Sequence, residues 1–276
     1  MTRAPKISLV TPSFNQAAFI ERTLRSVIDQ NYPDLEYIVV DGGSTDGSVE
    51  IIKQYGSAIS CWVSEPDNGQ TDAIVKGFQR ASGSILAYLN SDDILLPGSL
   101  QLMADALDVS RPQWAVGWQK IIDENDKVIA RRPVYPFTIG DIWFNKYLVP
   151  QECTFFTRQM YDRIGGLDPT YYYAMDMHAW LKMASISQPV FLKEYIGCFR
   201  VHGAQKTSSM DRYFAEGAQA VRDVGLWRGN QGMPSSPHRP VFRGPLHRLA
   251  KALFYFYAGG LKVLKEIYHF QRQWRS

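Results

Sequence analysis

The sequence predicts an α/β fold in which helices flank a doubly wound, mostly parallel mixed sheet. Two observations lead to this prediction. Short apolar segments alternate with amphipathic helical segments over the first hundred residues, and a polar loop follows each apolar segment. Strands that alternate with helices form βαβ units, whose connections are right-handed and whose strands lie parallel. The length of 276 residues gives room for one large domain and a small appendage.

The first half of the chain supplies the parallel part of the sheet. Apolar runs predict strands at 7–10, 35–40, 59–63 and 85–89. Apolar residues at helical spacing predict helices at 13–28, 48–55, 71–81 and 97–107. Ser13 and Gln16 have the spacing of a capping box, so we expect the first helix to begin at Ser13.

The second half predicts antiparallel strands in the same sheet. Residues 114–119 and 127–131, joined by the polar turn 123–126, have the pattern of a hairpin. Residues 175–184 have the spacing of an amphipathic helix, and the Gly, Pro and Ser residues of 225–245 favour a linker. We therefore expect one domain over residues 1–225, followed by a linker and a helical tail over residues 226–276.

Composition excludes several classes of protein. Hydrophobic residues make up 45% of the chain and charged residues 21%, which excludes a mainly disordered protein. Three cysteines without a CxxC pair exclude a disulfide framework and a cysteine zinc site, and favour a reducing compartment. No apolar stretch has the length of a signal-peptide core or the ~20 residues of a membrane-spanning helix. We expect a cytoplasmic protein.

The charge is distributed unevenly along the chain. Residues 226–276 contain nine Lys or Arg and one Glu, a charge of +8, so the rest carries 3 − 8 = −5. Residues 241–276 mix apolar with basic residues, as do helices that lie at a membrane interface. We expect peripheral contact of 241–276 with the inner face of the cell membrane; the alternative is a helix that packs on the domain. Nucleic acid is not an expected partner, because no recognition motif accompanies the basic tail.

Several nucleotide and hydrolase motifs are absent from the sequence. Gly42 and Gly47 have the spacing of a P-loop, but Ser48-Val49 follows where a P-loop has Lys and Ser or Thr. No G-x-G-x-x-G follows the first predicted strand, which argues against a dinucleotide-binding dehydrogenase. No G-x-S-x-G is present, so a hydrolase nucleophile is not indicated.

Carboxylates follow several predicted strands. Polar segments come directly after the strands at 11–15, 41–47, 65–72 and 90–93. Ligands of doubly wound sheets bind at the carboxyl ends of the strands, so these segments are expected to share one rim. Asp92-Asp93 supplies the one or two carboxylates that a divalent cation needs when it also holds a diphosphate. The alternative is that either residue caps the following helix or forms an Asx turn.

Five motifs in order carry a family resemblance. They are Thr11-Pro-Ser-Phe-Asn15, Val40-Asp-Gly-Gly-Ser-Thr-Asp-Gly-Ser48, Glu65-Pro-Asp-Asn-Gly69 with Asp72-Ala73 and Lys76-Gly77, Leu89-Asn-Ser-Asp-Asp93, and Tyr171-Tyr-Tyr-Ala-Met-Asp176 before His178-Ala-Trp-Leu181. Together they resemble the successive signatures of the family-two inverting glycosyltransferases with the GT-A fold. The resemblance covers about residues 6–205 and implies a glycosyltransferase that uses a nucleoside-diphosphate sugar, with a UDP-sugar expected.

The resemblance also implies roles for individual residues. It places eight residues at the donor: Thr11, Pro12, Asn15, Asp41, Asp67, Lys76, Asp92 and Arg200. Asp93 and His202 are expected to bind Mn²⁺ or Mg²⁺, although Asn90-Ser91-Asp92-Asp93 departs from a literal D-x-D and Asp92 and Asp93 could exchange roles. For Asp41, Lys76 and His202 the alternatives are a turn residue, a solvated helix lysine and a loop histidine without a role.

The fifth motif implies the catalytic base. Asp176 stands at the position of the general base, which an inverting transfer needs on its acceptor side. The alternative, compatible with this role, is that Asp176 caps the helix that follows it. Gln151 and Glu152 are candidates to face the acceptor, which we expect to be a glycan or lipid-linked sugar in surface polysaccharide synthesis. The competing interpretation is a catalytically silent module that binds sugar nucleotides or glycans.

Overall fold

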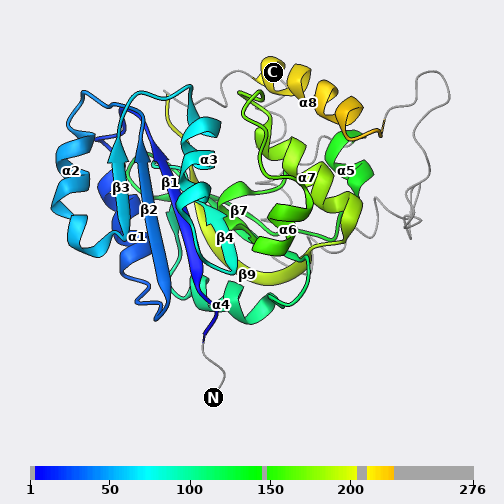
Figure 1. The fold of residues 1–276 in the computed structure, drawn as a ribbon, viewed down its shortest axis with the longest axis horizontal. Helices are drawn as coiled ribbons and strands as arrows, with labels where there is room; N and C mark the ends of the chain where they lie inside the picture. Colours follow the sequence, from blue (N-terminus) through cyan, green and yellow to red (C-terminus); the bar gives the residue numbers. More distant parts are fainter. Residues whose placement is uncertain (1–3, 145–147, 204–209, 227–276) are drawn as a thin grey trace.

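The computed structural model describes residues 4–144, 148–203 and 210–226. Over these residues the strands form one mixed sheet with helices on both faces (Figure 1). No helix in the described ranges is long and apolar enough to cross a membrane. The predicted tail and all but the first two residues of the predicted linker lie outside the described ranges, so the expected division at residue 225 stays a prediction.

The first strands of the chain form the parallel part of the sheet. In spatial order they are β3 (Cys61–Ser64), β2 (Leu35–Asp41), β1 (Ile7–Ser13) and β4 (Ile85–Tyr88). The neighbouring strands in this group are all parallel. The carboxyl ends of these strands therefore lie along one edge, as the sequence predicted.

The second half of the sheet begins with an antiparallel strand. Its strands are β8 (Thr154–Thr157), β6 (Trp114–Ile122), β9 (Val190–Arg200) and β5 (Ile94–Leu95), with β7 (Val128–Arg132) paired to β6. Strand β8 runs antiparallel to both β4 and β6, whereas β9 is parallel to β6. The predicted hairpin is confirmed as the β6–β7 pair.

Helices cover the two faces of the sheet in two groups. The helices α1 (Ile20–Ile28), α2 (Ser48–Gln54) and α4 (Ser99–Ala106) pack on one face. The other face carries α3 (Gln70–Arg80), α5 (Ile139–Phe144), α6 (Arg158–Arg163), α7 (Met175–Ile186) and α8 (Met210–Asp223). Short 3₁₀ turns occur at Gly56–Ala58 and Gln151–Cys153. Side chains alternate between these cores along a strand, so Leu9 and Val10 belong to different cores.

Helix α3 lies unusually close to the sheet. A Cβ atom added to Gly77 of α3 would lie 2.4 Å from the Cγ1 atom of Val10 on β1. No side chain fits into this space, so the glycine fixes the distance between α3 and β1. Helix α7 packs more conventionally: the ring of Trp180 stacks on that of Trp114, with 5.9 Å between the ring centroids.

The predicted start of the first helix is wrong. Ser13 is the last residue of β1, and α1 begins only at Ile20. Between them Asn15 has a φ of 51°, which is not helical. The backbone N–H groups of Gln16 and Ala17 donate to side chains of the next loop, at distances of 2.9 Å to Ser48 and 2.9 Å to Asp46. Side chains some 30 residues later in the sequence therefore replace the predicted capping box.

Candidate functional site

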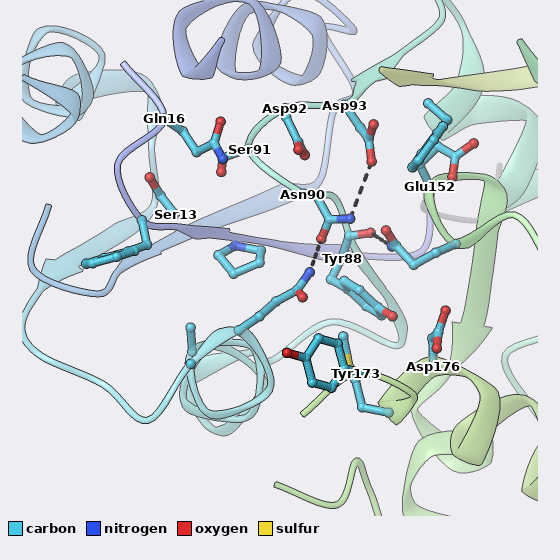
Figure 2. Close-up of a pocket in the computed structure, with 18 of the residues that line it drawn as sticks. Ser13, Gln16, Tyr88, Asn90, Ser91, Asp92, Asp93, Glu152, Tyr173 and Asp176 are labelled. Atoms are coloured by element: carbon cyan, nitrogen blue, oxygen red, sulfur yellow. Dashed lines mark hydrogen bonds between the residues drawn. The ribbon is translucent and has the colours of Figure 1, made fainter. Parts of the chain in front are cut away.

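A pocket of about 670 Å³ opens at the carboxyl ends of the parallel strands (Figure 2). Loops after β1, β2, β3 and β4 form one side of it, the segment 172–176 and Tyr213 form the other, and residues 148–152 lie between them (Figure 2). The volume is within the range usual for small-molecule sites. Of the predicted site residues, the pocket is lined by Pro12, Asp67, Asp92, Asp93 and Asp176.

Asp93 is held in place from several sides. Its side chain is buried, and its Oδ1 atom accepts the backbone N–H of Arg200 at 2.9 Å. The Asn90 side chain donates to Oδ2 at 3.4 Å, and the Thr23 hydroxyl donates to the backbone carbonyl of Asp93 at 2.7 Å. Burial, with the neighbouring charges of Asp92 and Glu152, raises the pKa of Asp93 well above its ordinary value.

Neither Asp92 nor Asp93 caps the following helix. Helix α4 begins at Ser99 with Gly98 at its N-cap, so the helix-capping alternative is wrong. Asp92 instead pairs with His202, whose Nε2 atom lies 3.0 Å from Asp92 Oδ2. The ring of Phe19 lies beside His202, with 4.6 Å between the ring centroids, and fixes the position of the imidazole.

Arg200 lies behind the carboxylate pair and not on the pocket surface. Its fully buried guanidinium donates to the backbone carbonyls of Asp92 at 2.6 Å and Asp123 at 3.1 Å, and it pairs with Asp126. These contacts hold its side chain among the loops, and Arg200 does not line the pocket, so the expected contact with a diphosphate stays a prediction. Arg200 therefore ties the Asp92-Asp93 loop to the β6–β7 turn.

The carboxylate pair fits a divalent cation that arrives with a diphosphate. Within the described part of the chain, no group of three or more His, Cys, Asp or Glu side chains is arranged to hold a metal ion by itself. Mg²⁺ and similar cations need only one or two protein carboxylates when phosphate oxygens and water complete the coordination. The Asp93 carboxylate is buried and lies beside Asp92 and Glu152. A cation at this position would stabilise its ionised form.

Two predicted donor residues, Asp41 and Asn15, organise loops. Asp41 is fully buried and accepts the N–H groups of Gly43 at 3.1 Å and Ser44 at 2.9 Å, and the hydroxyl of Ser64 at 2.7 Å. The Asn15 side-chain oxygen accepts the Thr45 N–H at 3.0 Å. None of these carboxylate or amide groups lines the pocket.

Thr11 and Lys76 also lie away from the pocket surface. The Thr11 hydroxyl is buried and lies 3.0 Å from the Tyr37 hydroxyl. Lys76 forms ion pairs with Asp72 at 3.3 Å and Glu65 at 3.5 Å. Lys76 is therefore not a fully solvated lysine, and its contact with a base or phosphate stays a prediction.

Asp67 and Gly42 form part of the pocket wall. Asp67 Oδ1 accepts the Gly69 N–H at 2.7 Å, and a Cβ atom on Gly42 would lie 2.7 Å from Asp67 Oδ2. Only glycine at position 42 leaves this carboxylate in place. Gly69 in turn has a φ of +105°, and its Cα faces the ring of Tyr172, so the two sides of the pocket meet here.

Asp176 lies on the side of the pocket opposite the Asp92-Asp93 pair (Figure 2). It is the second residue of α7, and Ala174 occupies the N-cap, so the capping alternative is wrong. Its Oδ1 atom accepts the Met177 N–H at 2.6 Å. The hydroxyl of Tyr213, from α8, donates a hydrogen bond to the Asp176 carboxylate. Both contacts orient the carboxylate.

Helix α8 holds the segment before Asp176, and the sequence analysis missed this helix. The Glu216 carboxylate accepts three consecutive backbone N–H groups, from Tyr172, Tyr173 and Ala174, at 3.3, 2.6 and 2.9 Å. The Tyr171 hydroxyl donates to Asp223 at 2.5 Å. The helical spacing of apolar residues over 210–223 is the signal in the sequence that could have predicted this helix.

Glu152 is a buried carboxylate between the two sides of the pocket. Gln119 donates to it at 2.7 Å, and burial raises its pKa above the ordinary value. Gly197 lies against it, because a Cβ atom there would be 2.9 Å from the Glu152 Cγ atom. The sequence analysis named Glu152 as a candidate to face the acceptor, and the structure places it on the pocket wall beside Asp93.

Comparison with known proteins identifies the family of this fold and site. The sequence model of glycosyl transferase family 2 matches residues 8–174, which is more than half of the chain. The chain belongs to glycosyltransferase family 2. A family relative, an uncharacterized glycosyltransferase of Mycobacterium tuberculosis, is 34% identical over 198 residues, which cover 70% of this chain and 74% of that protein.

Solved structures of glycosyltransferases share the fold. S. aureus TarS in complex with UDP-GlcNAc matches with a TM-score of 0.60 and 19% identity, over 80% of this chain and 66% of that chain. A mannosyltransferase from Pyrobaculum calidifontis in complex with GDP-Man and Mn²⁺ matches with a TM-score of 0.59 and 20% identity, over 96% of this chain and 73% of that chain. These likenesses confirm the predicted GT-A fold of this family member.

Proposed function

We propose that this protein is an inverting glycosyltransferase that moves a sugar from a nucleoside-diphosphate sugar to a glycan or lipid-linked acceptor, in the synthesis of a surface polysaccharide or glycan. One observation carries the proposal. A single pocket has the carboxylate pair Asp92-Asp93 on one side and Asp176 on the other. This is the arrangement that an in-line displacement at an anomeric carbon needs, with a held diphosphate opposite a base.

The proposed mechanism assigns a separate task to each side of the pocket. Asp176 accepts the proton of the acceptor hydroxyl as that oxygen attacks the anomeric carbon from the face opposite the diphosphate. The bond between the anomeric carbon and the diphosphate oxygen breaks in the same step, so the configuration inverts. Asp93, with His202 and Asp92 beside it, would hold Mn²⁺ or Mg²⁺, and such an ion would supply positive charge that stabilises a departing diphosphate.

The donor part of the proposal rests on both the pocket and the fold. Pro12, Asp67 and Asp92 line the pocket and are the proposed direct contacts of the donor. Thr11, Asn15, Asp41, Lys76 and Arg200 act by holding the donor loops in place. The two neighbours of known structure were solved with UDP-GlcNAc and with GDP-Man, and among the bases we propose uracil, with a hexosyl or N-acetylhexosaminyl group transferred.

A thermal-shift panel tests the donor and the metal together. UDP-, GDP-, dTDP- and CMP-sugars are each added with and without Mn²⁺, because a ligand that binds only the folded state raises its stability. We expect a shift with UDP-sugars that grows when Mn²⁺ is present. If no nucleotide sugar shifts a folded sample, the donor assignment is wrong.

The stereochemical outcome and the competing function have their own readout. NMR of the product with the active donor is expected to show an anomeric configuration opposite to that of the donor. Retention of configuration would contradict the assignment of Asp176 as a base. Binding of the donor without transfer to any acceptor would instead favour the silent binding module.

The tail carries a separate proposal that concerns location. We propose that residues 241–276 attach the protein to the cytoplasmic face of a membrane, where lipid-linked acceptors are found, because this segment mixes apolar with basic residues. The full chain is expected to sediment with vesicles that contain anionic lipid, and a chain truncated near residue 240 is expected to remain in solution. Vesicle binding that persists after truncation would contradict this proposal.

A further inference from the structure

Three side chains that line the pocket have a buried polar atom without a hydrogen-bond partner in the described part of the chain. Among the described residues, such atoms that belong to pocket-lining side chains are Ser13 Oγ, Tyr88 Oη and Gln151 Oε1. Tyr88 and Gln151 are neighbours, because the Gln151 Nε2 group donates to the backbone carbonyl of Tyr88 at 2.5 Å. A buried polar atom without a partner destabilises the folded protein, so such a pair in a pocket indicates a ligand.

The pair lies between the two functional sides of the pocket. Tyr88 is the last residue of β4, directly before the loop that carries Asp93. Its side chain is 2% exposed and is near Asp176 and Glu152, whose charges both act on it. Figure 2 shows Tyr88 between Asn90, which contacts Asp93, and Asp176. A donor whose diphosphate is at Asp93 and whose anomeric carbon faces Asp176 would place its sugar ring against this wall.

The chemistry of the pair matches a hydroxyl group. Burial raises the pKa of Tyr88 well above its ordinary value, so the phenol stays protonated and remains a donor. The Gln151 amide is oriented by its bond to the Tyr88 carbonyl, which leaves its oxygen as an acceptor. A sugar hydroxyl both donates and accepts, and therefore pairs with one donor and one acceptor at once.

We propose that Tyr88 and Gln151 together recognise one hydroxyl group of the transferred sugar and so determine which sugar the enzyme accepts. This inference rests on the proposed function and names the residues that select the sugar. A site that hydrogen-bonds a substrate hydroxyl strongly rejects analogues that lack this hydroxyl. The discrimination is far larger than that of an apolar site between substrates that differ by one methylene. The pair is therefore a specificity determinant and takes no proton in the reaction.

Calorimetric binding in the presence of Mn²⁺ tests the pair. The probes are UDP and GDP alone, then UDP-Glc, UDP-Gal, UDP-GlcNAc and GDP-Man, and the 3-, 4- and 6-deoxy analogues of the sugar that binds best. The wild type is expected to bind that sugar at least about tenfold more tightly than one of its deoxy analogues. Tyr88→Phe is expected to bind both equally, with an unchanged Kd for the nucleotide alone.

Tyr161→Phe is the matched control. Like Tyr88, Tyr161 packs edge-on against Phe78, but it does not line the pocket. This control is expected to retain the wild-type discrimination. Gln151→Met, which removes the acceptor with little change in volume, provides a second variant and is expected to lose discrimination at the same ring position.

Two results would overturn the inference, and they are distinguishable. Tyr88→Phe and Gln151→Met proteins that keep the wild-type discrimination at every ring position would show that other groups select the sugar. A wild type that binds no nucleotide and no nucleotide sugar would contradict the proposed function, and the inference with it.

Discussion

The Glu216 carboxylate accepts the backbone N–H of Tyr173 at 2.6 Å, three residues before Asp176. It also accepts the N–H groups of the two adjacent residues, so one side chain of α8 satisfies three donors that lie just before or at the start of α7. Hydrogen bonds to a charged acceptor are stronger than neutral ones. Glu216 is therefore a positioning residue for the proposed base, although it lies outside the pocket lining.

We expect Glu216→Ala to lower kcat about tenfold and the free energy of unfolding by about 2 kcal/mol, since hydrogen bonds to a charged group contribute about 1.5–3 kcal/mol. The Kd for the nucleotide should not change, because the donor loops do not contact Glu216. Turnover and calorimetric binding measure the two effects. Arg222→Ala is the control, because among the described residues the Arg222 side chain hydrogen-bonds to Gln219 alone, on the same helix. Equal losses of turnover in both variants would contradict a specific role of Glu216.

Asp176→Asn is expected to retain donor binding and to lose most transfer. The amide keeps the shape of the carboxylate but cannot accept the acceptor proton, so turnover should fall by the ~10²–10⁴-fold that general bases contribute. Single-turnover transfer and donor Kd values measure the two properties. Unchanged turnover would exclude Asp176 as the base.

Asp93→Ala is expected to abolish the effect of Mn²⁺ on donor affinity. Its carboxylate is the buried member of the pair, and its loss removes the charge that a cation needs at this position. Donor Kd values with and without Mn²⁺ give the readout. Asp105→Ala, an exposed site on α4, serves as the control. A variant whose donor affinity still responds normally to Mn²⁺ would place the metal ligand elsewhere.

Gly77→Ala is expected to destabilise the protein, although alanine normally stabilises a helix by about 1 kcal/mol relative to glycine. The new Cβ atom would lie 2.4 Å from Val10 Cγ1, so α3 or β1 must move. Overpacking of a core usually costs about 1–3 kcal/mol, which exceeds the gain in helix propensity. Chemical denaturation measures the difference. Gly203→Ala, where the space around the Cβ position is open, should be nearly neutral.

The stability of the protein is expected to fall as the pH decreases below about 6.5, in part through His178. Burial and the nearby Lys182 lower the pKa of His178 below its ordinary value of 6.5. The unfolded chain therefore binds more protons than the folded chain below that pH, and the free energy of unfolding decreases. Denaturation midpoints between about pH 5 and pH 7 should decline less in His178→Gln than in the wild type. An identical decline in the two proteins would exclude His178 as a cause of the pH dependence.

The strands of the parallel half of the sheet were predictable because local signals in the sequence specify them. Strands β1, β2 and β4 are short apolar runs followed by polar loops, and the carboxylates Asp92, Asp93 and Asp176 are part of motifs with fixed spacing. The pattern could not show where α1 begins, because the N–H groups of Gln16 and Ala17 are bound by side chains some 30 residues away in sequence.

The contacts that support the site could not be predicted for a similar reason. Glu216 lies 43 residues from Tyr173 in the sequence, and Arg200 lies 107 residues from Asp93. No local pattern links such pairs. A motif also does not indicate which way a side chain points: Asp41 has the expected type and position, but its carboxylate faces the backbone of its own loop.

The antiparallel strand β8 has a consequence for how such enzymes diversify. The loops that end β1, β2, β3 and β4 all precede residue 94, whereas Gln151, Asp176 and Tyr213 come from later segments. A genetic crossover between α4 and β6 would interrupt no parallel ladder, and only the β4–β8 and β5–β9 ladders would have to form anew. Recombination at this junction would replace the segments that carry Gln151, Asp176 and Tyr213 and keep the loops after β1 to β4, but it would also replace Arg200, which holds the Asp92-Asp93 loop.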